Sequence, residues 1–334
     1  MNPAMTSPLT PTPPTAEPID PIAEWLARRP HLILDGALAT ELERRGADLR
    51  DALWSARLLI EQPELIRAVH LDYFRAGADV ATSASYQATF EGFARRGLDA
   101  QAAAALMRRS VELAQEARAQ WLRERPGDDR RPAPLVAASV GPYGAMKADG
   151  SEYRGDYGLD EAALMAFHRP RLEVLKAAGA DLMACETLPC LAEARALARL
   201  MDELGLRGWI SFSCRDGGHT SQGEPIGDCA AALAPFASVV AIGVNCTAPQ
   251  HIASLVRAIR ARTERPVLVY PNAGEVWDAQ AKVWRAGPEC AHRAFDAQAM
   301  DWSEAGARLI GGCCRTSPAD IAALWRRWEQ ESAQ

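Results

Sequence analysis

The chain has 334 residues, 48% of them hydrophobic and 24% charged, and carries a formal net charge of −6 at pH 7. Nucleic acids and anionic membranes select for clustered positive charge, so neither is expected as a partner. No apolar run approaches the roughly 18 residues of a membrane span, and the N-terminus lacks the basic and apolar regions of a signal peptide. We therefore expect a cytoplasmic enzyme, whose eight cysteines stay reduced and serve as metal or catalytic groups rather than as disulfides.

The chain divides into a short polar start and one long uniform region. Residues 1–21 are rich in Pro, Thr and Ser and bury too little apolar surface to offset their ordering entropy, which predicts a disordered tail. From residue 22 to residue 334, short β-rich runs alternate with longer helical patterns. The candidate strands are eight apolar runs, at residues 31–35, 79–84, 135–140, 181–186, 208–213, 239–246, 266–271 and 308–313.

Amphipathic stretches between these runs supply the crossover helices of the predicted fold. Residues 63–74 and 318–328 carry apolar side chains at intervals of three and four, as a helix with one buried face does. Glycine can end a helix where an Ala-Gly-Ala sequence precedes a strand, at residues 76–78, 178–180 and 305–307. Eight βα units without a linker-like break predict a single (β/α)8 barrel, the α/β fold also called the TIM barrel. A doubly wound open sheet is the alternative, but residues 35–40 lack the spacing of its phosphate-binding turn.

Three cysteines lie where predicted strands end. Cys313 ends the eighth run directly after two glycines, Cys314 follows it, and Cys246 ends the sixth run. Strand ends share one mouth in a barrel, so three thiolates can surround a zinc ion, which is catalytic when one tetrahedral position stays open. A vicinal disulfide or two core thiols would also explain Cys313 and Cys314, but neither needs the preceding glycines or the third cysteine. An iron–sulfur cluster would require a fourth cysteine at close spacing.

The other cysteines are expected to be small core residues rather than ligands: Cys185, Cys190, Cys214, Cys229 and Cys290. A structural zinc site would need a fourth protein ligand, and His251, five residues after Cys246, is the candidate for that position. A non-catalytic zinc-binding barrel is therefore the alternative of a different functional class.

Acidic residues join the thiols at the predicted mouth. Asp35 ends the first run and Glu186 ends the fourth, and a pair of carboxylates suits a cation such as the ammonium group of an amino acid. The backbone N–H groups of Gly36 and Ala37 can take the carboxylate of the same ligand, as turn nests take other anions. Alternatively, Asp35 is a helix N-cap or turn residue, and Glu186 belongs to a buried salt bridge.

Seven segments of the chain form a recognisable set. They are DGALATEL at 35–42, ASYQA at 84–88, SVGPYG at 139–144, ETLP at 186–189, GVNC at 243–246, YPNAGE at 270–275 and GGCCRT at 311–316. The most specific of these signals is Asn-Cys followed by Gly-Gly-Cys-Cys. Together the segments resemble the zinc-dependent homocysteine S-methyltransferases, and the resemblance runs from about residue 30 to residue 328. Within that family, the chain is most similar to the bacterial and plant enzymes that use S-methylmethionine.

The resemblance implies a TIM-barrel fold and a site in which the three cysteines hold one zinc ion. Homocysteine sulfur would take the fourth position, and Asp35 and Glu186 would bind the substrate ammonium group. Tyr86 and Asn272 would line the donor side, although a Tyr at a strand end is as often packed core. The product would be methionine.

The methyl donor and the acceptor are less closely defined. Betaine-using relatives carry an aromatic residue directly after the glutamate that matches Glu186, whereas this chain has Thr187 there, which argues against a quaternary ammonium cage. S-methylmethionine is therefore the expected donor and S-adenosylmethionine the second candidate. Selenocysteine remains an alternative acceptor, because a selenol differs little in shape from a thiol.

Overall fold

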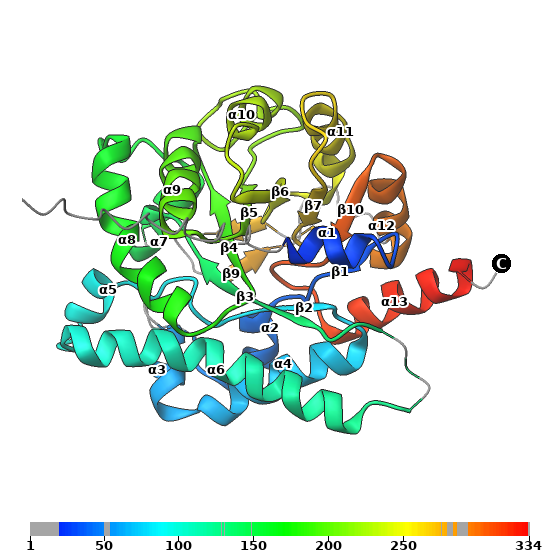
Figure 1. The fold of residues 1–334 in the computed structure, drawn as a ribbon, viewed down its shortest axis with the longest axis horizontal. Coiled ribbons are helices and arrows are strands. Elements are labelled where there is room, and N and C mark those ends of the chain that lie inside the picture. The colour runs from blue at the N-terminus through cyan, green and yellow to red at the C-terminus, as the bar shows by residue number, and fades with distance from the viewer. Residues whose placement is uncertain are drawn as a thin grey trace, which may run out of the picture.

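The computed structural model describes residues 20–49, 54–127, 129, 131–147, 149–274, 276–278, 283–285 and 293–332. Eight strands form one parallel sheet in the order β1-β10-β7-β6-β5-β4-β3-β2 (Figure 1). A bridge between Leu34 and Val80 then joins β1 to β2, so the sheet closes on itself. The strands are β1 (Leu32–Ile33), β2 (Val80–Thr82), β3 (Leu135–Val140), β4 (Leu182–Leu188), β5 (Gly208–Phe212), β6 (Val239–Asn245), β7 (Val267–Tyr270) and β10 (Ala307–Ile310).

This closed sheet confirms the predicted (β/α)8 barrel. Each predicted apolar run overlaps one strand of the barrel, in the predicted chain order. An open doubly wound sheet would leave two strands as free edges. Here the Asp35 N–H donates to the Val80 carbonyl at 3.1 Å and the Asp79 N–H donates to the Ile33 carbonyl at 2.7 Å, so β1 and β2 are paired with each other.

Helices surround the barrel, as Figure 1 shows. Both stretches predicted from apolar periodicity are helical, within α4 and α13, and glycines 77, 179 and 306 adopt the left-handed conformation expected after a helix. The helices are α1 (Pro21–Leu26), α2 (Leu38–Arg44), α3 (Trp54–Glu61), α4 (Pro63–Ala76), α5 (Phe90–Ala94), α6 (Ala100–Glu124), α7 (Tyr143–Lys147), the 3-10 helix η1 (Ser151–Tyr153), α8 (Glu161–Ala177), α9 (Leu191–Leu204), α10 (Ile226–Leu233), α11 (Pro249–Arg260), α12 (Phe295–Glu304) and α13 (Pro318–Ser332).

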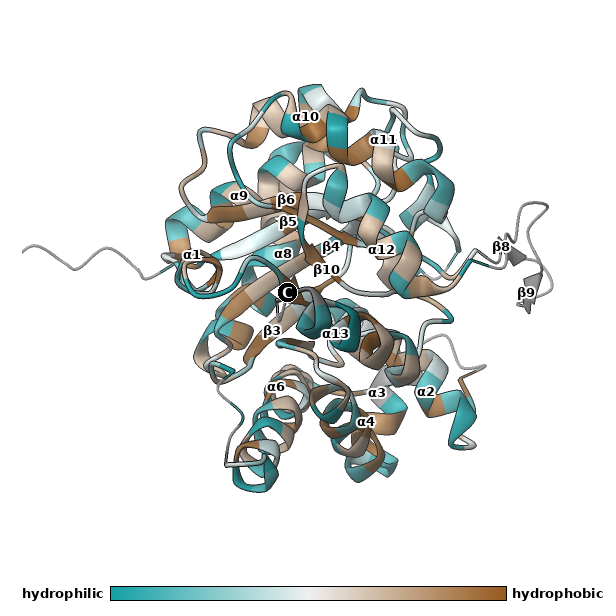
Figure 2. Ribbon diagram, turned by 90° about the vertical axis from the view of Figure 1, so that its right-hand side faces the viewer, coloured by the Kyte–Doolittle hydropathy of each residue, from teal (hydrophilic) through white to brown (hydrophobic). Residues whose placement is uncertain are grey.

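The hydrophobic core has two layers. The larger layer lies between the strands and the surrounding helices, and the smaller fills the inside of the barrel with side chains such as Trp209 and Leu309. Figure 2 shows hydrophobic residues along β6 and β10 and hydrophilic residues on the outer side of α6. Helix α1 contributes Ile22 and Trp25 to the inner layer and so covers the N-terminal end of the barrel.

Helix α1 begins one residue before the predicted start of the barrel domain. Helix α1 starts at Pro21, and the Asp20 side chain accepts from the Ile22 N–H at 3.0 Å and caps the helix, whereas the barrel domain was expected to begin at Ile22. The rest of the predicted tail, residues 1–19, lies outside the described residues.

One element was not expected from the sequence. Strands β8 (Val276–Asp278) and β9 (Val283–Arg285) pair antiparallel in the segment that follows β7. They form a separate two-stranded sheet and do not interrupt the barrel.

Within the described ranges, no helix is long and apolar enough to cross a membrane.

Candidate metal centre and active site

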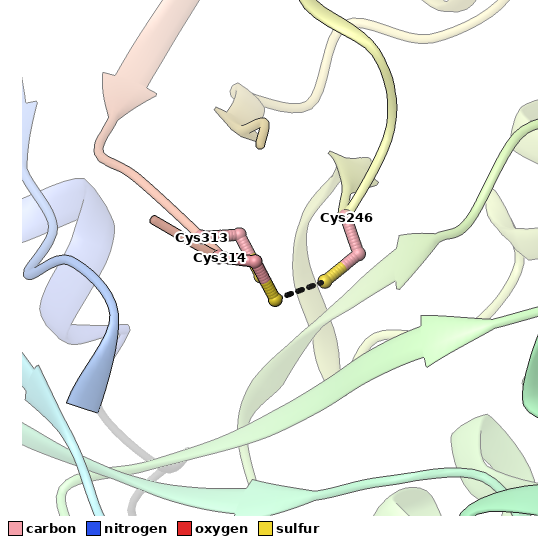
Figure 3. A group of neighbouring side chains, drawn as sticks. All are labelled: Cys246, Cys313 and Cys314. Atoms are coloured by element: carbon pink, nitrogen blue, oxygen red, sulfur yellow. Dashed lines mark hydrogen bonds between the residues drawn. The ribbon is translucent and has the colours of Figure 1, made fainter. Parts of the chain in front are cut away.

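The three predicted ligand cysteines meet at the C-terminal mouth of the barrel. Cys246 directly follows β6, and Cys313 and Cys314 follow β10 after two glycines. Their sulfur atoms all lie within 4.8 Å of one another (Figure 3). The Cys246 and Cys314 sulfurs are 3.9 Å apart, and the Cys313 and Cys314 sulfurs are 4.0 Å apart, which is far longer than a disulfide of about 2.05 Å.

The spacing of these sulfur atoms fits a tetrahedral metal. Zinc–sulfur bonds of about 2.3 Å place two ligands of a tetrahedron about 3.8 Å apart, close to the separations observed here. Hydrogen bonds from Cys313 and Cys314 hold the pKa of the Cys246 thiol well below its usual range, and the same contacts with Cys246 raise the pKa of both partners. Without a bound cation, Cys246 is therefore the thiol of the cluster that ionises most readily, and the two others donate to it.

The cluster offers three protein ligands, one fewer than a closed tetrahedral site needs. Within the described part of the chain, no His, Asp, Glu or further Cys belongs to the cluster of three thiols. His251, the candidate fourth ligand of a structural site, lies on α11 and is outside it. Such an open position is characteristic of catalytic rather than structural metal sites.

Two glycines let the end of β10 approach β1. A Cβ atom on Gly311 would lie 2.5 Å from Cβ of Leu34 and 2.6 Å from the Asp35 carbonyl oxygen, and one on Gly312 would lie 2.5 Å from Cβ of Thr316. The Gly312 N–H donates to the Asp35 carbonyl at 3.0 Å. Side chains at these positions would therefore push the thiols away from Asp35.

The backbone around the mouth adopts uncommon conformations. Four non-glycine residues in the described ranges have positive φ, and three of them lie here: Thr187 at 61°, Cys246 at 46° and Arg315 at 73°. This conformation is especially unfavourable for a β-branched residue such as Thr187. Residues held in this way cost about 1–3 kcal/mol each and tend to cluster at functional sites.

Asn245 holds Thr187 in this conformation. Its Oδ1 accepts from the Thr187 N–H at 2.8 Å, and its Nδ2 donates to the Thr187 hydroxyl at 2.8 Å. The Ser211 hydroxyl also donates to Asn245 Oδ1 at 2.8 Å and lies 2.6 Å from the Tyr270 hydroxyl. A polar network therefore links β4, β5, β6 and β7 beneath the thiols.

The sequence interpretation missed this network. Asn245 and Ser211 are polar residues inside otherwise apolar strand runs, and that pattern was the available signal. The partners of each residue depend on which strands are neighbours, which only the closed barrel shows.

Asp35 is buried at the end of β1, with 6% of its surface exposed. Its carboxyl accepts from the Thr82 N–H at 2.8 Å and from the Thr82 hydroxyl at 2.6 Å. Burial raises the pKa of Asp35 to about 7, against the lowering effect of these hydrogen bonds. The carboxyl does not act as the N-cap of α2, because Ala37 occupies that position.

Glu186 lies within β4 and is 9% exposed. Burial raises its pKa to about 8, hydrogen bonds from Ser139 and Tyr270 oppose that shift, and the charges of Cys246 and Asp35 add to it. Across the described residues, Glu186 forms no ion pair, so the alternative of a buried salt bridge has no support in this structure. The two carboxyls and the thiols thus interact electrostatically at one mouth.

The turn after Asp35 is more tightly packed than predicted. The Ala37 N–H donates to the Thr316 hydroxyl at 3.2 Å, so it does not stand free for a ligand as the sequence suggested. A Cβ atom on Gly36 would lie 2.9 Å from both Thr316 and Tyr73. A ligand carboxylate could therefore use Ala37 only by displacing the Thr316 hydroxyl.

The two predicted donor-side residues also reach the mouth. Tyr86 is half-buried and its carbonyl accepts from the Gly141 N–H at 3.2 Å, while its ring would lie 2.7 Å from a Cβ atom on Gly141. Asn272 follows β7, and its N–H donates to the Thr247 carbonyl at 3.2 Å. The Asn272 Oδ1 is buried and has no hydrogen-bond partner in the described part of the chain, which leaves it available to a ligand.

The cysteines assigned to the core lie apart from the thiol cluster. Cys185, Cys190 and Cys229 are buried, and Cys214 is partly buried. Burial raises the pKa of the Cys185 and Cys190 thiols to about 12, which keeps them protonated and inert. Cys290 lies outside the described residues.

Two further residues at the mouth were not predicted. The loop after β3 carries Glu152 and Tyr153 on η1, and a hydrogen bond from the Tyr153 hydroxyl contributes to the low pKa of Cys246. The Cys246 charge in turn raises the pKa of Glu152. This loop has no periodic pattern, so no local signal predicted that it lies near the thiols.

Comparison with known proteins agrees with this geometry. The family model for homocysteine S-methyltransferase matches residues 32–328. The chain is 52% identical over 312 residues to the homocysteine S-methyltransferase YbgG of Bacillus subtilis, covering 92% of this chain and 98% of that protein. It is 47% identical over 307 residues to a selenocysteine Se-methyltransferase of Brassica oleracea, covering 89% and 88%.

A solved structure shows the same architecture. The metallated form of the homocysteine methyltransferase MmuM from Escherichia coli superposes with a TM-score of 0.83 at 50% sequence identity, covering 92% of this chain and 100% of that one. Family match, identity and fold therefore agree over nearly the whole barrel. The chain belongs to the homocysteine S-methyltransferase family, a family of methyltransferase enzymes.

Proposed function

We propose that this enzyme transfers a methyl group from S-methylmethionine to the sulfur of homocysteine and forms methionine. The observation that carries the proposal is the thiol cluster of Cys246, Cys313 and Cys314 beside two buried carboxyls at the same mouth. The thiols suit a metal that binds the acceptor sulfur, and the carboxyls suit the ammonium group of an amino acid. Membership of the family supports homocysteine as that amino acid.

Zinc is the metal we propose for the three cysteines, because three sulfur ligands and an open position match its catalytic chemistry. A free thiol with a pKa of about 8.5 is only roughly 3% ionised at pH 7, and bound zinc would supply the acceptor as a thiolate. The metallated form of the Escherichia coli relative supports a metal in this family.

Asp35 and Glu186 are proposed to bind the ammonium group of the acceptor. Their pKa values of about 7 and about 8 reflect burial without a cationic partner, and an ammonium ion would favour both ionised forms. The turn at Gly36 and Ala37 is proposed for the carboxylate, with the Thr316 hydroxyl giving up its contact with Ala37. The two carboxyls and the turn would together fix the direction in which the acceptor sulfur points.

The reaction then requires alignment more than activation of the donor. The acceptor thiol loses its proton to solvent, its sulfur forms a bond to the methyl carbon, and the carbon–sulfur bond of the sulfonium breaks with both electrons passing to the leaving sulfur. A thiolate and a sulfonium cation become two neutral thioethers, so one turnover yields two molecules of methionine. The residues of the mouth position the three atoms in line and exclude water, which contributes several kcal/mol.

Thr187 supports a sulfonium donor rather than betaine. An aromatic residue at this position would provide a face for a quaternary ammonium ion, whereas Thr187 is fixed by Asn245 in a left-handed conformation. Tyr86 and Asn272 are proposed to line the donor side. S-adenosylmethionine is the second sulfonium donor to consider.

Selenocysteine is a second candidate acceptor. The observation that favours it is the 47% identity with a selenocysteine Se-methyltransferase, in a fold whose mouth distinguishes poorly between a thiol and a selenol of similar shape. Both acceptors carry the same ammonium and carboxylate groups, so the roles proposed for Asp35 and Glu186 hold for either.

A panel of donors tests the proposal. The enzyme is incubated with homocysteine and S-methylmethionine, S-adenosylmethionine or betaine, each labelled in the methyl group, and labelled methionine is measured. We expect S-methylmethionine to give the fastest turnover, S-adenosylmethionine a slower one and betaine none. Preferred turnover of betaine or of a folate methyl donor would contradict the proposed donor.

A further inference from the structure

Glu152 has an unusual position for a carboxylate. Its Oε2 atom is buried and has no hydrogen-bond partner among the residues that the structure describes. The backbone around it is closely held, since the Ser213 hydroxyl donates to the Glu152 carbonyl at 3.5 Å and a Cβ atom on Gly144 would lie 2.4 Å from the Glu152 nitrogen. The backbone of Glu152 is therefore closely held, while one oxygen of its carboxylate has no partner among the described residues.

The charges around Glu152 are mainly negative. Burial raises the pKa of this carboxyl, and the charges of Asp149 and Cys246 raise it further, while Arg154 opposes the shift. Glu152 forms no ion pair with any residue in the described ranges. A buried carboxylate in such surroundings is unfavourable unless a cation binds beside it.

The geometry separates Glu152 from the acceptor carboxyls. Asp35 and Glu186 stand at the ends of β1 and β4 and interact with each other, whereas Glu152 comes from η1 and interacts with Tyr86 and Cys246. Tyr153, the next residue, is 37% exposed, and its hydroxyl helps to lower the pKa of the Cys246 thiol. One carboxylate and two aromatic side chains therefore surround the approach to the thiols from the loop side.

We infer that Glu152, together with Tyr86 and Tyr153, recognises the positively charged sulfonium group of the methyl donor. The inference rests on the proposed function and names the residues of its donor side. A carboxylate attracts the cation through its charge, and aromatic rings attract a cation through their electron-rich faces. Glu152 is thus a specificity-determining residue for cationic donors.

This role has a kinetic consequence. The positive charge of the sulfonium disappears as the methyl group leaves, so the attraction to Glu152 is greatest for the bound substrate and weaker in the transition state. An interaction of this type lowers KM without raising kcat. It also favours release of the neutral thioether product over the charged substrate.

The test compares Glu152→Gln with the unchanged enzyme. Losing a contact between charged groups should raise the KM for S-methylmethionine about tenfold or more. The kcat should stay the same or rise, because the lost interaction is weaker in the transition state than in the bound substrate. The KM for homocysteine and the metal content should stay unchanged. In a thermal melt, S-methylmethionine should stabilise the unchanged enzyme more than the variant, which gives a readout independent of turnover.

Two further variants sharpen the comparison. Glu152→Asp keeps the negative charge on a side chain that is one methylene group shorter. Its KM for the donor should rise less than that of Glu152→Gln. Asp149→Asn removes a charge three residues away, on a side chain that is 45% exposed, and should change this KM less than about twofold. Because Glu152 has an unpartnered buried oxygen, the neutral Gln variant is expected to fold at least as well as the unchanged enzyme.

An unchanged KM for S-methylmethionine in Glu152→Gln would overturn the inference, and so would a rise confined to homocysteine. Both results would leave the proposed function standing, since the unchanged enzyme would still use the donor. If the unchanged enzyme does not use S-methylmethionine at all, the proposed donor is wrong and the inference fails with it.

Discussion

The two ends of the barrel are built from the same strands but carry different chemistry. At the N-terminal end, Leu32 of β1 and Leu309 of β10 are fully buried in the inner apolar layer, which α1 covers with Ile22. Three residues after Leu32 stands Asp35, and four residues after Leu309 stands Cys313. Each of these two strands therefore leads from the buried core to a residue of the candidate site within three or four residues.

Burial has a different physical consequence at each end of the barrel. At the covered end, burial removes apolar surface from water and stabilises the fold. At the mouth, burial raises the pKa of Asp35 and Glu186, and the backbone of Thr187 is held in an unfavourable conformation. The covered end thus stabilises an arrangement at the mouth that would not be favourable by itself.

The largest effect is expected at the mouth itself. Cys313→Ala should leave a folded barrel with little bound metal and no measurable turnover, because two thiolates hold a zinc ion poorly. The melting temperature should fall only by the contribution of the lost metal, because the apolar core is unchanged. Elemental analysis and the labelled-methionine assay together check this, and a variant with stoichiometric metal and normal turnover would remove the proposed ligand set.

A change at the covered end should lower the stability of the fold and leave substrate binding unchanged. Ile22→Ala removes a fully buried side chain and should lower the free energy of unfolding by about 2–5 kcal/mol. The KM values for both substrates should stay the same at a temperature where the variant is folded. Denaturant unfolding and steady-state kinetics measure the two quantities, and a large change in KM without loss of stability would contradict the separation of the two ends.

The acceptor carboxyls should affect affinity and not metal content. Asp35→Asn and Glu186→Gln should each raise the KM for homocysteine about ten- to hundredfold, since each removes a charge from the ammonium site. Thiols without an amino group serve as the control, because their use should not depend on either carboxyl. If the unchanged enzyme uses such thiols as well as homocysteine, the roles assigned to these residues are wrong.

The same carboxyls predict a pH dependence. With raised pKa values of about 7 and about 8, Asp35 and Glu186 become neutral as the pH falls through this range and no longer pair with an ammonium ion. The KM for homocysteine, relative to that for a thiol without an amino group, should therefore rise as the pH falls. Glu186→Gln should flatten this ratio, and a ratio that rises toward alkaline pH instead would contradict the assignment.

The smallest effect is expected from a thiol outside the cluster. Cys190 is 3% exposed and its pKa is raised to about 12 by burial, so Cys190→Ala should cost at most a little stability. Metal content and turnover should be unchanged. This variant is the matched control for Cys313→Ala, and a loss of metal in it would show that thiol number rather than position matters.

The sequence predicted those parts of the site that depend on position along one strand. Cys246, Cys313 and Asp35 directly follow apolar runs, so a closed barrel necessarily brings them to one mouth. The contact of Asn245 with Thr187, 58 residues earlier, and that of Ala37 with Thr316, 279 residues later, depend on strand register and loop packing. Glu152 lies in a loop without periodicity, where no local pattern indicates which side chain faces the thiols.

Metal removal and restoration test the central claim most directly. The mass of the native protein and its turnover of labelled S-methylmethionine with homocysteine are measured on the same sample, before chelation, after chelation and after zinc is added back. We expect one zinc ion per chain before chelation, no turnover in the metal-free protein, and turnover that returns with the bound zinc. Full turnover by the folded, metal-free chain would contradict a metal-dependent transfer at Cys246, Cys313 and Cys314.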